Sequence, residues 1–224
     1  MVIDQISRQA QIIYESLERS PFITVRNRDR SVKLQPMTGY SVQAFDSFYA
    51  RTRTTADGNC LYSSLSIIKI GSEKLTHSMR LLAVNAMLNN IDYFKRLCNV
   101  FDRTFEGEIE TIATNKTWSA EIQVQAVSVA LSNPIYVYNR FENNPEKGHY
   151  MLSDISMQEL INRFNQGTAG AHFRYIGYKS DMNKLGFCVH FTGIHFDALL
   201  PLRNDPQQFI PKGDLINMKF IDEK

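Results

Sequence analysis

Hydrophobic side chains recur every three or four residues in several stretches of the chain, a spacing that places them on one face of an α-helix. Leu61, Leu65 and Ile68 form one such row, and Ser119 stands where it would serve as the N-cap of another helix. The pattern predicts helices over residues 5–18, 60–70, 76–90, 119–131 and 157–166.

Runs rich in β-branched and aromatic residues predict strands between and after these helices. They cover residues 134–139, 172–178, 187–191 and 194–200, and a β-hairpin is expected over 22–37. Residues 91–117 have a mixed pattern that favours neither state, and the tail after Pro201 is expected to be irregular with one more short element. Because helices and strands interleave, the sequence predicts an α/β or α+β fold.

The expected hairpin carries an excess of positive charge. A solvated strand face and a patch that binds a partner both explain such charges, and the sequence leaves the two alternatives open. The basic residues are Arg26, Arg28, Arg30 and Lys33.

The composition is that of one ordinary globular domain. The chain has 224 residues, 43% of them hydrophobic and 21% charged, which is enough to bury a core without disulfides or metal. The formal net charge is only +2, so we expect neither nucleic acid nor a membrane surface as a partner. The N-terminus is too polar for a signal peptide, and no apolar run approaches the length of about 18 residues typical of a membrane span.

The chain contains three cysteines, at positions 60, 98 and 188. An odd number without any CxxC pair argues against a disulfide framework and against a zinc site built on cysteines. We expect free thiols in a reducing compartment such as the cytoplasm, and no metal or cofactor. Cys98 and Cys188 lie in apolar surroundings and are expected in the core.

Cys60 is a candidate nucleophile because of where it stands in the stretch "TTADGNCLYSSLS", residues 54–66. The turn Asp57-Gly58-Asn59 leads directly into the expected helix, so the thiol would lie at the positive end of the helix dipole, which favours a thiolate. The backbone N–H groups from Gly58 to Cys60 could point at a developing oxyanion. The alternative is a small buried residue at the start of a core helix.

Of the five histidines, His195 has the most informative neighbours. In a strand over 194–200, His195 and Asp197 would share one face while Ile194, Phe196 and Ala198 share the other. A carboxylate at this spacing can orient an imidazole and stabilise its protonated form, as the third member of a catalytic triad does. A structural histidine satisfied by its neighbour is the alternative.

Four motifs in order resemble the ovarian-tumour (OTU) family of deubiquitinating cysteine proteases. They are "DGNCLYSSLS" at 57–66, "MRLLAVNAML" at 79–88, "WSAEIQVQAVSVALSNPIYVYN" at 118–139 and "HFDAL" at 195–199. The resemblance covers roughly residues 50–200. It implies a papain-type cysteine protease fold, with a mostly antiparallel central sheet flanked by helices, and hydrolysis of the isopeptide bond after the C-terminal glycine of ubiquitin.

The resemblance also implies roles for individual residues. Cys60 would be the nucleophile, His195 the general base and Asp197 the third member of the triad. Residues 57–59 would form the oxyanion loop, in which Asp57 acts by shaping the backbone, with Gly58 and Asn59 completing it. We further expect His190 to position the substrate, and Trp118 either to position the substrate or to serve in packing alone.

The same resemblance suggests a division of the chain into an N-terminal extension, 1–45, a catalytic domain, 46–203, and a C-terminal tail, 204–224. The expected partner is ubiquitin or polyubiquitin, bound by a monomer. Three alternatives stay open: a protease for a ubiquitin-like modifier, a protease for a viral polyprotein, and a catalytically weak ubiquitin-binding module. The stretch "GIHFDALLP" is also similar to OTU domains of viruses and mobile elements, which makes a viral or pathogen-effector origin one hypothesis.

Overall fold

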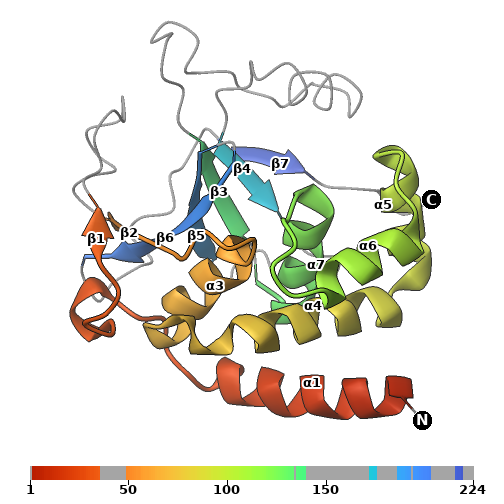
Figure 1. The fold of residues 1–224 in the computed structure, drawn as a ribbon, viewed down its shortest axis with the longest axis horizontal. Coiled ribbons are helices and arrows are strands. Elements are labelled where there is room, and N and C mark those ends of the chain that lie inside the picture. The colour runs from red at the N-terminus through yellow and green to blue at the C-terminus, as the bar shows by residue number, and fades with distance from the viewer. Residues whose placement is uncertain are drawn as a thin grey trace, which may run out of the picture.

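The computed structural model describes residues 2–35, 49–133, 135–139, 172–175, 186–192, 194–202 and 215–218, which form a twisted sheet with helices packed against it (Figure 1). The strands in spatial order are β1 (Leu34–Gln35), β2 (Tyr49–Thr52), β6 (Phe196–Pro201), β5 (Phe187–Phe191), β3 (Ile135–Asn139), β4 (His172–Tyr175) and β7 (Leu215–Met218). The pairs β3–β5 and β4–β7 are parallel, and the other four pairs are antiparallel. The expected α/β fold with a mostly antiparallel sheet is confirmed.

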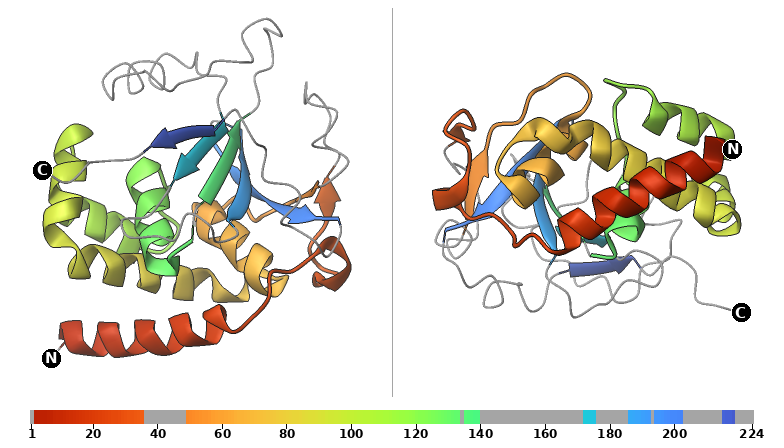
Figure 2. Two further views of the ribbon diagram at one scale, coloured as in Figure 1. Left: turned by 180° about the vertical axis from the view of Figure 1, so that it is seen from behind. Right: turned by 90° about the horizontal axis from the view of Figure 1, so that it is seen from below.

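The helices lie in a layer beside the sheet, with the first helix outermost (Figures 1 and 2). α3 packs on β5 and β6, and α4 packs on α3, α6 and α7, while α1 packs mainly on α4. Their bounds are α1 (Val2–Glu18), α3 (Cys60–Ile70), α4 (Thr76–Asn89), α5 (Ile91–Val100), α6 (Phe105–Ala113) and α7 (Glu121–Leu131), with short 3-10 helices at Val25–Asn27 and Glu73–Leu75.

α3 has the predicted bounds and is buried along nearly its whole length. Leu61, Leu65 and Ile68, the row identified in the sequence, are all at most 2% exposed and belong to the central hydrophobic core. The helix ends at Gly71, whose φ of +76° allows its N–H to donate to the carbonyl of Ile67 at 2.7 Å. Burial on all sides fixes the helix against the sheet, and with it the position of its first residue, Cys60.

β5 and β6 form the centre of the sheet beneath α3. All six residues of β6 and the first four of β5 are buried, as expected for strands covered on both faces. The two strands pair with His190 opposite Asp197 and Phe191 opposite Phe196. The predicted strand over 194–200 is therefore present but begins two residues later, at Phe196.

The hairpin predicted over 22–37 is wrong. A 3-10 helix occupies Val25–Asn27, and the short β1 pairs with β2 instead. The backbone of this segment finds partners elsewhere: Ile23 N–H donates to the carbonyl of Ile68 at 2.9 Å, and the Arg28 guanidinium donates to the carbonyls of Val25 and Val32. These bonds replace the ladder that alternation alone would have predicted.

Three further segments have different outcomes. Residues 91–117, left unassigned, contain α5 and α6. Ser119 is not the N-cap of α7: Ala120 holds that place, and its N–H donates to Oε1 of Gln123 at 2.8 Å. The helix predicted over 157–166 lies outside the described residues.

No helix in the described part of the chain is long and apolar enough to cross a membrane.

Candidate active site

Cys60 is the first residue of α3, and its side chain is 2% exposed. The chain reaches it through Gly58, whose φ is +88°, a conformation that favours glycine. A Cβ atom on Gly58 would lie only 2.0 Å from the carbonyl oxygen of Lys116. Glycine at this position therefore permits two loops, 57–59 and 114–118, to touch through their backbones.

The loop before Cys60 is held by bonds between its own side chains. The Asp57 carboxylate accepts from the backbone N–H of Asn59 at 3.0 Å and from its side-chain amide at 3.1 Å. This corrects the expectation that all N–H groups from Gly58 to Cys60 are available to an oxyanion, because Asp57 occupies that of Asn59. Among the described residues, the N–H groups of Gly58 and Cys60 have no protein acceptor.

Arg80, a residue of α4, joins this loop to the loop 114–118. Its side chain is 4% exposed and donates to Oδ1 of Asn59 at 2.8 Å, and to the carbonyls of Gly58 at 3.2 Å and Thr117 at 2.6 Å. The guanidinium also lies over the ring of Tyr62, 4.4 Å from its centroid. A buried arginine that satisfies several carbonyls at once fixes their relative positions.

His195 and Asp197 come together as predicted. His195 precedes β6 and Asp197 lies within it, so both side chains leave the same face, and the imidazole Nε2 is 3.1 Å from Oδ1 of Asp197. The same Nε2 lies 2.9 Å from Oγ1 of Thr54. With Nε2 engaged, the other ring nitrogen, Nδ1, is the one left to act on Cys60.

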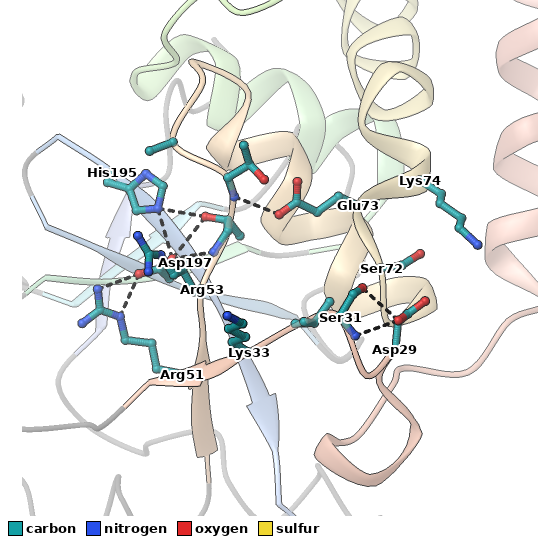
Figure 3. A pocket seen from close by; sticks show the side chains of 14 residues that line it. Asp29, Ser31, Lys33, Arg51, Arg53, Ser72, Glu73, Lys74, His195 and Asp197 are labelled. Atoms are coloured by element: carbon teal, nitrogen blue, oxygen red, sulfur yellow. Dashed lines mark hydrogen bonds and ion pairs between the residues drawn. The ribbon is translucent and has the colours of Figure 1, made fainter.

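Asp197 has further partners from the chain that enters the Cys60 loop (Figure 3). The Arg51 guanidinium holds Oδ2 through Nε at 2.8 Å and Nη2 at 2.6 Å, and the backbone N–H of Thr54 donates to Oδ1 at 3.0 Å. The carboxylate has no exposed surface. A fully buried charge is tolerated only with such compensation, so these contacts fix the carboxylate and, through it, the imidazole.

These contacts shift the pKa values of both groups. The hydrogen bond that the imidazole donates to Asp197 is the main reason that the pKa of His195 rises to about 9, and the adjacent Cys60 side chain contributes to the rise. Burial would raise the pKa of Asp197, but hydrogen bonds from His195, Thr54 and Arg51 outweigh burial and lower it to about 2. At neutral pH the pair is therefore imidazolium and carboxylate.

Trp118 and His190, the residues expected to position substrate, lie in different surroundings. The Trp118 side chain is 48% exposed, donates from Nε1 to the carbonyl of Ile194 at 3.0 Å and stands beside the Phe191 ring. It therefore flanks His195 at the surface. His190 is fully buried in β5, so its side chain cannot position a substrate by contact.

Sequence reasoning missed three residues that hold the site: Arg51, Thr54 and Arg80. Only Arg80 left a signal. It lies three and four residues before Ala83 and Val84 on the buried face of α4, where a charged side chain needs partners. Arg51 and Thr54 gave none, because their partner Asp197 lies more than 140 residues away.

The other two cysteines are buried, as expected of core residues. Burial raises the pKa of the Cys98 thiol to about 11. Within the described ranges, no cluster of histidine, cysteine or acidic side chains could hold a metal ion.

Comparisons with known proteins identify the family and the fold. The family model of the OTU-like cysteine proteases matches residues 55–173. The ubiquitin thioesterase otu2 of Schizosaccharomyces pombe is 28% identical over 143 residues, which is 56% of this chain and 44% of that protein, so the match spans less than half of the relative. The viral OTU domain protease of Taggert virus is 17% identical with a TM-score of 0.50, over 78% of this chain and 96% of the viral one, which shows a shared fold.

We predict that Gly58→Ala separates the two loops that meet at this residue. The added Cβ would collide with the Lys116 carbonyl, and the positive φ is costly for alanine, so the free energy of unfolding should fall by about 2 kcal/mol or more. Amide NMR resonances of residues 57–60 and 115–117 should move together. Gly71→Ala is the control, since it has a similar φ at the other end of α3 and should leave those resonances in place. Unchanged resonances in Gly58→Ala would contradict the contact.

We predict that Asp197→Asn lowers the pKa of His195 from about 9 towards its ordinary value near 6.5. The raised pKa means that the imidazolium stabilises the fold fully below about pH 6.5 and that this contribution is lost as the pH rises through about 9. Titration of the His195 ring by NMR measures the shift directly. Asp92→Asn, an exposed change on α5, is the control. A His195 pKa near 6.5 in the unaltered protein would overturn the interpretation.

Proposed function

Because the chain belongs to the OTU-like cysteine protease family, we propose that it is a deubiquitinase that cleaves the isopeptide bond after the C-terminal glycine of ubiquitin. The main support is the His195–Asp197 pair, with Nε2 of the imidazole 3.1 Å from Oδ1 of the carboxylate, beside the Cys60 thiol at the start of α3. The name of the fission-yeast relative, a ubiquitin thioesterase, supports ubiquitin as the modifier.

In the proposed mechanism the Cys60 thiolate attacks the carbonyl carbon of the terminal glycine. The proton of the thiol has passed to Nδ1 of His195, since Nε2 is engaged by Asp197 and Thr54. Asp197 keeps its negative charge throughout and holds the ring in orientation. The carbonyl oxygen becomes an oxyanion as the C–S bond forms.

Two backbone N–H groups, those of Gly58 and Cys60, are the proposed donors to this oxyanion. Asp57 takes the N–H of Asn59 and so sets the turn that presents the other two. Arg80 holds the other side of the same turn, because it donates to the backbone carbonyl of Gly58 and to the side-chain Oδ1 of Asn59. Donors held in place before the reaction stabilise the new charge without reorganisation.

Collapse of the tetrahedral intermediate breaks the C–N bond, and the imidazolium gives its proton to the departing lysine amine. The neutral imidazole then takes a proton from a water molecule, whose oxygen attacks the thioester. Collapse of this second tetrahedral intermediate breaks the C–S bond and leaves Cys60 as a thiolate beside the imidazolium. Ubiquitin departs as a carboxylate after its carboxyl proton passes to solvent.

Trp118 is proposed to contact the modifier beside the scissile bond. Its indole is bonded to the carbonyl of Ile194, and the Ile194 side chain is 80% exposed, so an apolar surface flanks His195. We also propose that the activity is cytoplasmic, because a reducing compartment keeps the thiol of Cys60 free.

We predict that a ubiquitin probe with a C-terminal electrophile labels this protein at Cys60. Cys60→Ala should abolish labelling, measured as a shift in mass, because it removes the thiol beside the His195 imidazole. Cys98→Ala is the matched control and should label like the unaltered protein, because Cys98 is a buried thiol of raised pKa. Failure of the unaltered protein to label, or equal labelling of Cys60→Ala, would overturn the proposed function.

We predict unequal losses of kcat/KM at the two partners of Cys60. His195→Ala removes the general base and should cost about 10³-fold or more, whereas Asp197→Asn removes the orienting charge and should cost less, about 10²-fold. Hydrolysis of ubiquitin with a C-terminal aminocoumarin measures both. His77→Ala, an exposed change on α4, serves as the control. Equal losses at His195 and Asp197 would contradict the separate roles.

A further inference from the structure

A cavity of about 890 Å³ opens beside His195 (Figure 3). It lies between the segment 29–33 that precedes β1, residues 51–56 of β2 and the chain after it, and residues 72–74 before α4. His195 and Asp197 form part of its wall, and Lys33, Arg51 and Arg53 line its strand side. Residues 57–60 do not line it. The cavity therefore meets the candidate active site on the imidazole side alone.

The strand side of this cavity holds two positive charges that face each other. The pairing of β1 with β2 continues so that Lys33 stands opposite Arg53, whose N–H donates to the Lys33 carbonyl at 2.8 Å. Like charges at opposite positions of paired strands destabilise the sheet. Over the described residues, neither side chain has an acidic partner.

The acidic groups of the wall are already engaged elsewhere. Asp29 accepts from the backbone and hydroxyl of Ser31 at 2.9 and 2.8 Å, and Glu73 accepts from the N–H of Thr55 at 2.8 Å. Asp197 is held by Arg51 and His195. Asp29 and Glu73 keep their charge in these bonds, but the wall also holds Lys74, so that four lysine and arginine side chains face three carboxylates. A negatively charged ligand would balance the excess at Lys33 and Arg53.

The position of the cavity decides which part of a substrate it can reach. The acyl carbon must lie on Sγ of Cys60 with its oxygen at the 58–60 loop, and the leaving nitrogen must face the imidazole that protonates it. The cavity reaches the imidazole through the partners of its Nε2, Thr54 and Asp197, and does not reach the loop 57–60, so the leaving side of a substrate is nearer to it than the acyl side. Trp118 and Ile194 flank His195 and take no part in the cavity wall.

We propose that this cavity binds an acidic segment of the protein that carries the modified lysine, adjacent to the scissile bond, through Lys33 and Arg53. The proposal rests on the proposed function and adds a preference for the sequence on the leaving side. Electrostatic attraction to these two cations raises the local concentration of a negatively charged segment.

The test compares leaving groups that differ only in charge. Ubiquitin is joined through an isopeptide bond to the lysine of three short fluorescent peptides, with aspartates, serines or arginines around that lysine. Aminocoumarin-ubiquitin, which has no peptide on the leaving side, is the fourth substrate. The variants are Lys33→Gln/Arg53→Gln and the control Lys95→Gln/Arg96→Gln, which removes the same charge from exposed positions on α5.

We expect the unaltered protein to cleave the acidic conjugate with a kcat/KM about fivefold above that of the serine conjugate, the effect of two exposed ion pairs, and the arginine conjugate more slowly still. The preference should shrink with added salt. Lys33→Gln/Arg53→Gln should abolish the preference and leave the aminocoumarin substrate unaffected, and the α5 variant should retain it. Equal rates for all three conjugates, a preference that survives the Lys33/Arg53 change, or an equal loss on aminocoumarin-ubiquitin would overturn the proposal.

Binding separates this proposal from the proposed function. The free aspartate peptide should shift the amide resonances of Lys33 and Arg53 in the Cys60→Ala protein, where no turnover can occur. If the protein cleaves no ubiquitin substrate but shows these shifts, the deubiquitinase activity is refuted and the binding site for acidic segments at Lys33 and Arg53 stands. If the protein cleaves ubiquitin substrates but shows neither these shifts nor a charge preference, the deubiquitinase activity stands and the binding site for acidic segments is refuted.

Discussion

The buried carboxylate of Asp197 is the contact on which the geometry of the site depends. It has no exposed surface, so its charge must be compensated from within the protein, and that requirement joins segments far apart in the chain. Arg51 and Thr54 approach it from β2 and the chain that follows, and His195 from the start of β6. The chain that leaves Thr54 leads within six residues to Cys60. The anion that orients the imidazole therefore also fixes the entry to the cysteine loop.

Arg80, a buried cation, fixes the other half of the site, the loop before Cys60. Arg80 binds carbonyl oxygens of the loop before Cys60 and of the segment that ends at Trp118. The hydrogen bonds of Arg80 and those of Asp197 go to different groups in the described part of the chain, so the cation and the anion are each satisfied by a separate set of partners. One charge orders the nucleophile and oxyanion donors, and the other orders the base. Removing either would leave its partners unsatisfied in the core, which is costlier than losing the attraction alone.

The periodicity of apolar residues predicted the features that depend on neighbouring residues alone. The bounds of α3 and β5 followed from the spacing of apolar residues, and the shared face of His195 and Asp197 followed from strand alternation. The hairpin over 22–37 was wrong because its backbone bonds to the end of α3, which no alternation within the segment reveals. The burial of His190 and the roles of Arg51 and Thr54 depend on strand order in the sheet. Strand order is decided by contacts between distant segments, and the pattern of residues within each segment does not specify those contacts.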